Sequence, residues 1–184
     1  MSKSEIQRLL NDPPPSWKGL FKKYKLPARP SAAKVINTIL EFTPTGKQYG
    51  AKGAAAYTPP AAVRKAALKG LKLAHKYNYT SSSGIGLARG IQLALQPKIW
   101  ERSVKRMNNY FTRHEIDKLG RNFGNDKDPS NGYMAWLLWG GDPGQKWAAM
   151  KVNPAPGYQS WQWTQQDWRS VILKGTKIDY SKKC

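Results

Sequence analysis

Lysine and arginine side chains recur at helical spacing in two parts of this sequence. The first series, at i, i+4, i+7 and i+11, is Lys65, Lys69, Lys72 and Lys76. The second series has the same spacing, with one asparagine among the arginines, and is Arg102, Arg106, Asn109 and Arg113. Residues so spaced share one face of an α-helix. Such a stripe contacts phosphate groups or acidic protein surfaces, unless it is a solvated helix face. If the two helices are neighbours, their stripes form one basic patch.

The charge of the whole chain also points to an anionic partner. The 184 residues include 31 Lys plus Arg and 11 Asp plus Glu, which gives a formal net charge of +20. The excess is largest over residues 61–121 and smallest over residues 122–184. A charge of this size attracts polyanions, and the three candidates are nucleic acid, a membrane surface and an acidic protein assembly.

Aromatic side chains near both ends of the chain are candidate contacts for a partner protein. Trp17 and Phe21 share the apolar face of a short amphipathic segment. Trp161, Trp163 and Trp168 fall within eight positions and exceed what a short tail can bury on itself. Because aromatic anchors dominate protein interfaces, we expect these five residues to be partner anchors.

Patterns that support catalysis or metal binding are missing from the sequence. There is no HExxH or CxxC spacing, and Cys184 is the single cysteine. His114 is interpreted as a satisfied, partly buried histidine. The glycine-rich residues 84–90 match no known phosphate-binding loop and are interpreted as the start of a helix, although such a start can hold a phosphate. We expect no catalytic residue, no metal ion and no cofactor.

Proline, glycine and apolar residues divide the chain into three parts. Residues 1–58 are expected to form an extended N-terminal arm in which short helices alternate with prolines, ending in a linker. Residues 59–150 are expected to form a compact helical core domain. Residues 151–184 form a tryptophan-rich C-terminal extension. The predicted fold class is mainly α.

Hydrophobic periodicity and capping residues predict the helices. They span about residues 2–11, 17–25, 31–42, 60–77, 85–95, 97–119, 131–139, 143–148 and 164–173. The helix from Pro97 to Leu119 is expected to be the longest. The helix over residues 131–139 is apolar on all sides, so we expect it in the middle of the core, with Gly140 and Gly141 ending it.

Two elements of the central segment form a specific combination. One is the RM-x2-YF-x-RH pattern of residues 106–114, and the other is the WLLWGGD-x-G-x2-W pattern of residues 136–147. Together with residues 60–64 and 84–95 they resemble a small basic domain of tailed phages and large double-stranded DNA viruses, including the algal giant-virus group. The resemblance covers about residues 59–150. It implies a virus-encoded protein built into the particle, and it carries over no catalytic residue.

Two functions fit these observations. The first is a minor capsid protein of the virion that bridges other capsid proteins through its arm, basic helix faces and aromatic tail. The alternative is a virion-packaged protein that binds or condenses double-stranded DNA without sequence specificity. A membrane-surface function ranks third because the amphipathic segment 17–25 is short. We expect a virion protein without enzymatic activity or a secretory signal.

Overall fold

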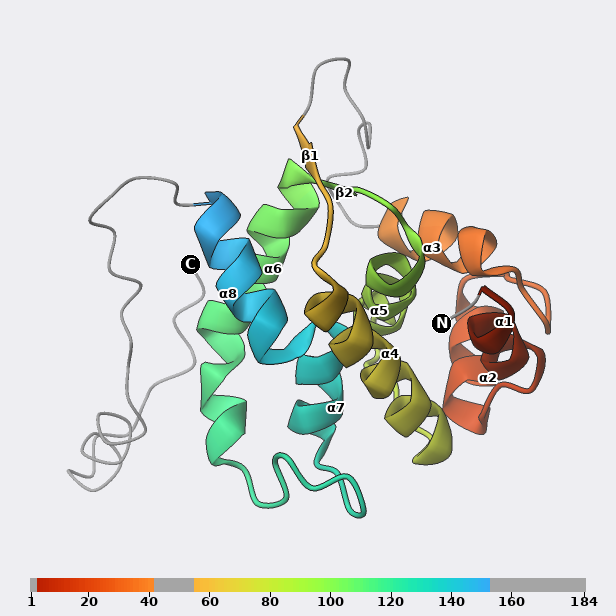
Figure 1. Cartoon of the computed structure of the whole chain (residues 1–184). Helices are drawn as coiled ribbons and strands as arrows, with labels where there is room; N and C mark the ends of the chain where they lie inside the picture. The colour runs from red at the N-terminus through yellow and green to blue at the C-terminus, as the bar shows by residue number, and fades with distance from the viewer. Residues whose placement is uncertain (1–2, 42–54, 153–184) are drawn as a thin grey trace, which may run out of the picture. The chain divides into compact units, whose positions relative to one another are not determined.

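The computed structural model describes residues 3–41 and 55–152. In these residues the chain is mainly helical, which confirms the predicted fold class (Figure 1). The helices are α1 (Lys3–Asn11), α2 (Pro15–Lys23), α3 (Ala32–Glu41), α4 (Ala61–Lys76), α5 (Ile85–Leu95), α6 (Glu101–His114), α7 (Asn131–Leu138) and α8 (Gly141–Val152). Two short strands, β1 (Ala56–Tyr57) and β2 (Ile99–Trp100), and a 3₁₀-helix (Glu115–Leu119) complete the described elements. The predicted anchors Trp161, Trp163 and Trp168 lie outside the described residues.

Local sequence explains several helix ends. The hydroxyl of Ser31 accepts a hydrogen bond from the backbone N–H of Lys34 (3.2 Å) at the start of α3. Ser130 caps α7 in the same way, accepting from the N–H of Tyr133 (3.1 Å). These caps satisfy N–H groups that have no partner inside the helix. Gly140, with φ of 108°, follows α7 in a conformation that side chains other than glycine rarely adopt.

Helix α7 is buried among four other helices. It packs against α4, α5, α6 and α8. Its buried residues are Tyr133, Met134, Trp136, Leu137 and Leu138, whereas Asn131, Gly132 and Ala135 on the remaining side are exposed or half-buried. The prediction that this apolar helix lies in the core is confirmed for its buried side.

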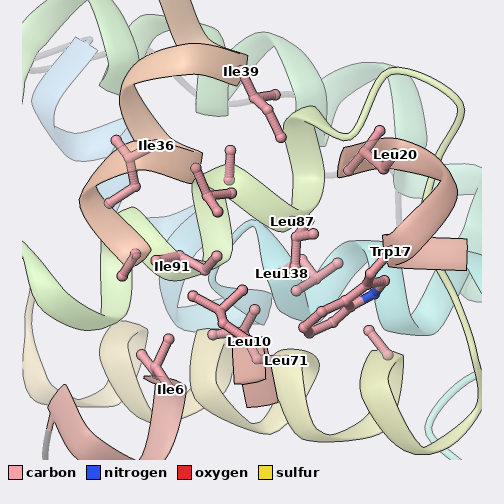
Figure 2. Packing of buried hydrophobic residues seen from close by; sticks show 14 of the residues in the cluster. Ile6, Leu10, Trp17, Leu20, Ile36, Ile39, Leu71, Leu87, Ile91 and Leu138 are labelled. Carbon is pink, nitrogen blue, oxygen red and sulfur yellow. The ribbon is translucent and has the colours of Figure 1, made fainter. Parts of the chain in front are cut away.

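The N-terminal helices pack on the helical body instead of forming an extended arm. Helix α3 packs against α5, and α1 packs against α3 and α4. Figure 2 shows side chains of these helices meeting Leu71 and Ile91 in one hydrophobic cluster. Trp17 and Phe21 are each 1% exposed, so the expectation that they anchor a partner protein is wrong. Burying these apolar side chains against the helical body removes their surface from water, which stabilises the folded chain without a partner protein.

The segment before α6 also differs from the prediction of a helix over residues 97–119. Residues of β2 pair antiparallel with β1, with Ile99 opposite Tyr57 and Trp100 opposite Ala56. Backbone groups engaged in a strand pair cannot join a helix, so α6 begins at Glu101. After His114 the chain tightens into the 3₁₀-helix. The longest helix among the described residues is therefore α4.

Candidate anion-binding pocket

Lys69, in the predicted stripe of α4, is neutralised by an acidic residue from a distant loop. Its Nζ lies 2.7 Å from Oδ2 of Asp126 and donates a hydrogen bond to the hydroxyl of Tyr133 (3.0 Å). The hydrogen bond to Asp126, followed by that to Tyr133, raises the pKa of Lys69. The same contact with Lys69 holds the pKa of Asp126 below its usual value. The charge of Lys69 is therefore used in contacts within the folded chain.

The other lysines of this stripe differ in their contacts. Nζ of Lys72 lies 2.7 Å from Oε1 of Glu5 on α1. Lys65 and Lys76 are exposed, and neither forms an ion pair within the described part of the chain. Two of the four predicted lysines thus have paired charges, and two face solvent.

The arginine stripe of α6 does not join the lysine stripe of α4. Helix α6 packs mainly on α8, and α8 and α7 both pack on α4, so these two helices link α6 to α4 (Figure 1). The condition for one shared basic patch, that the two helices are neighbours, is therefore not met, because α7 and α8 link them. The arginine stripe is itself divided: Arg106 and Arg113 line a pocket, whereas Arg102 is exposed and is not among the lining residues.

This pocket has a volume of about 670 Å³ and lies between α6, α7 and the start of α5. One wall is a single face of α6, formed by Arg106, Asn109, Tyr110, Arg113 and His114. Their spacing of i, i+3, i+4, i+7 and i+8 places them on one side of the helix. Arg113 is exposed and forms no hydrogen bond or ion pair with the residues that the structure describes. The wall therefore presents a cation that no acidic group of this region neutralises.

A stack of aromatic rings supports this wall. The rings of Tyr110 and Trp139 are parallel, with centroids 4.3 Å apart, and His114 stacks on Tyr110 at 4.5 Å. The guanidinium carbon of Arg89 lies 5.5 Å from the centroid of Trp139. Arg89 is 0% exposed and donates a hydrogen bond to the side chain of Gln92. A buried arginine stays charged, so this stack has a cation at one end.

The facing wall consists of the loop before α5 and the start of that helix. Its lining residues are Ser81, Ser83, Ile85 and Gly86. The N-cap of α5 is Gly84, whose φ of 66° is left-handed. The hydroxyl of Ser83 accepts a hydrogen bond from the N–H of Ile85 (3.4 Å). The first turn of any helix has N–H groups without intrahelical partners, and these favour an anion.

The N-terminal helices position this loop. Three side chains in or just after α2 donate hydrogen bonds of 2.8 Å to its backbone carbonyl oxygens, with Trp17 donating to Tyr79, Lys23 to Ser82 and Tyr24 to Ser83. A Cβ atom at Gly84 would lie 2.5 Å from Cδ2 of Leu20, so α2 also packs directly on the loop. Helix α2, which the sequence analysis assigned to a partner-binding arm, thus holds this loop of the pocket wall in place.

Asp117 is the acidic residue that lines the pocket. Its Oδ2 lies 3.3 Å from Nδ1 of His114. It also borders the start of α7, because a Cβ atom at Gly132 would lie 2.9 Å from the Cβ of Asp117. A carboxylate there is favoured by the helix dipole. The start of α7 therefore has an internal anion, which distinguishes it from the start of α5.

Two tyrosine hydroxyls of the pocket lie in a poorly hydrated place. Tyr110 is 6% exposed, and its hydroxyl forms no hydrogen bond with any described residue. Burial, and then the negative charge of Asp117, raises the pKa of both Tyr79 and Tyr110 above the usual value. Both phenols remain neutral hydrogen-bond donors at physiological pH.

Residues 3–41 and 55–152 contain no cluster of three or more histidine, cysteine, aspartate or glutamate residues that could hold a metal ion. In the same residues no helix has both the length and the apolar character needed to cross a bilayer.

The sequence predicted only part of this site. It indicated Arg106 and Arg113 as cation contacts, but it did not identify Tyr110, Trp139 or Arg89. Arg106, Tyr110 and Arg113 recur at i, i+4 and i+7, a signal for one shared helix face. The apolar helix around Trp139 gave no comparable signal, because its aromatic residues fit a core position equally well.

The described residues thus form a small helical protein with a basic, aromatic-walled pocket. Comparisons with family models, curated proteins and solved structures give no match for this chain.

Proposed function

We propose that this protein is a component of a double-stranded DNA virus particle and that its folded body binds the packaged genome through phosphate contacts. The observation that carries the proposal is the excess of cations over internal anions. The chain has 31 Lys plus Arg against 11 Asp plus Glu. Even complete pairing of the acidic residues would leave a large positive charge for an external polyanion.

The ion pairs of the fold strengthen this argument. Glu5, Glu101, Asp126 and Asp142 each lie within ion-pair distance of a lysine of the same chain. Together with Glu115, which lies 3.9 Å from Lys118, these are five of the 11 acidic residues of the chain. Lys65 and Lys76 are exposed and available to an external phosphate backbone. The viral origin implied by the resemblance of residues 59–150 supports packaged DNA as that backbone.

The test is binding to covalently closed circular duplex DNA as a function of salt. Contact with about six phosphates would give a slope of roughly −5 for log K against log salt. Replacing Lys65 and Lys76 together with glutamine should reduce the slope by roughly 2 if each contacts one phosphate. The matched control replaces Lys69 and Lys72, whose charges are already paired, and should change the slope less. Absence of salt-dependent binding would contradict the proposal.

A minor capsid protein that bridges shell proteins is the second candidate. It is favoured by the three tryptophans Trp161, Trp163 and Trp168, which fall within eight positions of the C-terminal extension. In the described residues the large hydrophobic side chain that is exposed is Met150, so that region presents little apolar area to a partner. Fractionation of disrupted particles separates the candidates. A genome-binding protein leaves with the DNA, whereas a bridging protein stays with capsid fragments.

A further inference from the structure

We propose that the pocket between α5, α6 and α7 binds the terminal phosphate of a nucleotide. The inference rests on the proposed function, because it assumes that the bound phosphate belongs to a nucleic acid. It adds one defined site to the exposed cations of the surface. The same phosphomonoester occurs at the end of a DNA strand and on a free mononucleotide. The volume of about 670 Å³ is in the usual range for small-ligand sites.

The cations of the pocket match the charge of such a group. Arg106 and Arg113 are seven residues apart on α6, which is roughly 10 Å along the helix axis. Tyr110 lies between them on the same face. Two flexible arginine side chains extending from either side of Tyr110 can converge on one dianion and bind it bidentately.

The hydroxyl of Tyr110 favours a ligand that has hydrogen-bond acceptors, because it lacks a partner among the described residues. This residue is 6% exposed, and its hydroxyl has no hydrogen-bond partner among the described residues. Tyr110 lines the pocket together with Tyr79 and Asp117, and its hydroxyl oxygen is itself buried. Buried hydroxyls in proteins are normally hydrogen-bonded. A small movement of the neighbouring side chains would let a phosphate oxygen in the pocket supply the missing acceptor.

Further donors lie on the facing wall. Nε1 of Trp139 is near the start of α5, because a Cβ atom at Gly86 would lie 3.7 Å from it. The indole N–H forms no hydrogen bond in the part of the chain that the structure describes. The backbone N–H groups of the first turn of α5 are close to it. Indole and backbone donors, a tyrosine hydroxyl and two arginines together form an oxyanion site.

The concave shape favours a terminal phosphate over an internal one. Phosphodiesters of a continuous duplex lie on a convex surface between two sugars, so they contact exposed cations such as Lys65 more readily than a buried hydroxyl. A phosphomonoester protrudes and carries up to two negative charges, which suits two arginines beside the single, His114-paired carboxylate of Asp117.

The experiment compares two short single strands that differ only in a 5′-phosphate or a 5′-hydroxyl, bound to the full chain at about 0.15 M salt. The phosphorylated strand should bind at least about tenfold more tightly, as expected for charge-assisted hydrogen bonds. Tyr110→Phe and Arg113→Gln should each reduce this preference. Their matched controls, Tyr77→Phe and Lys146→Gln, change a tyrosine and an exposed cation outside the pocket and should retain it.

Competition with deoxyadenosine monophosphate identifies the source of the phosphate. Displacement of the labelled strand by the mononucleotide, but not by deoxyadenosine, would support a site for free nucleotides as well as strand ends. Resistance to the mononucleotide together with a strong 5′-phosphate preference would support strand ends. Equal affinity for the two strands, or a preference that survives both Tyr110→Phe and Arg113→Gln, would overturn the inference.

Closed circular DNA keeps the two proposals separable because it has no strand ends. Salt-dependent binding to the circle without a 5′-phosphate preference would overturn the pocket assignment and leave the proposed function intact. A 5′-phosphate preference without binding to the circle would overturn the proposed function and support the pocket.

Discussion

The ring of Tyr110 lies parallel to the indole of Trp139, with centroids 4.3 Å apart and planes 5° apart. These residues belong to the two sequence patterns that characterise residues 106–114 and 136–147. Their contact therefore joins both patterns at one wall of the pocket. The hydroxyl of Tyr110 is buried and has no hydrogen-bond partner among the described residues.

Tyr110→Phe should make the protein less sensitive to alkaline pH. Burial, and then the charge of Asp117, raises the pKa of Tyr110 above its usual value of 10.0. Above that pH the unfolded chain loses the phenol proton while the folded protein keeps it, so stability falls as pH rises. Urea unfolding from about pH 8 to about pH 11 should show a shallower loss of stability for the variant than for the native protein.

At neutral pH the same substitution should change stability by less than about 1 kcal/mol, because it removes a buried hydroxyl that has no partner and keeps the ring stack. An identical alkaline loss of stability in both proteins would show that Tyr110 ionises as easily in the folded state as in the unfolded chain.

Trp17→Ala should destabilise the protein by about 3–5 kcal/mol. Trp17 is 1% exposed and its indole N–H donates to the carbonyl oxygen of Tyr79 (2.8 Å). The change creates a cavity and releases the loop that forms the pocket wall. Denaturant unfolding measures the effect, and Lys18→Ala, an exposed neighbour on α2, should stay within about 0.5 kcal/mol. A small effect of Trp17→Ala would mean that α2 detaches readily from the body.

Two glycine-to-alanine substitutions should have opposite effects. Gly84 has a φ of 66°, and a Cβ atom there would lie 2.5 Å from Leu20. Gly84→Ala should therefore destabilise the protein by more than about 1 kcal/mol and weaken phosphate binding at the start of α5. Gly19 lies inside α2 with no atom within 4 Å of its added Cβ. Gly19→Ala should stabilise the protein by about 0.5–1 kcal/mol through helix propensity. Thermal unfolding compares the two, and equal effects would contradict the assigned backbone geometry.

The contact between Lys69 and Asp126 should stabilise the folded protein at intermediate pH, and this contribution should be lost in both acid and alkali. The pKa of Asp126 is lowered from 3.8, mainly by its hydrogen bond with Lys69, so its contribution is present above that value and is lost as pH falls through the lower folded pKa. The pKa of Lys69 is raised from 10.5, so its contribution is present below that value and is lost as pH rises further.

A double-mutant cycle of Lys69→Met and Asp126→Asn measures this term. Because both side chains are about half exposed, the coupling near neutral pH should not exceed about 1 kcal/mol. It should disappear in strong acid. A coupling that persists after Asp126 is protonated would show that packing, and not charge, links the two residues.

The local parts of the fold were predictable from the sequence. The start of α3 at a Ser31 cap, the span of α5 and the turn at Gly140 follow from capping groups and backbone preferences that act over a few residues. The division of residues 97–119 into a strand and two helical forms was not predictable. It depends on the pairing of Ile99 with Tyr57, a residue far away in the sequence.

The sequence by itself determined the helical fold class, the apolar and polar faces of most helices, and the large net positive charge. Only the tertiary structure decided which faces remain available. An amphipathic helix such as α2 has the same pattern whether its partner is another protein or its own chain, and here α2 is covered by the body. Likewise, Arg106, Tyr110 and Arg113 share a face by periodicity alone. Helix packing over long sequence separations is what places Trp139 and the start of α5 beside that face and makes it a pocket.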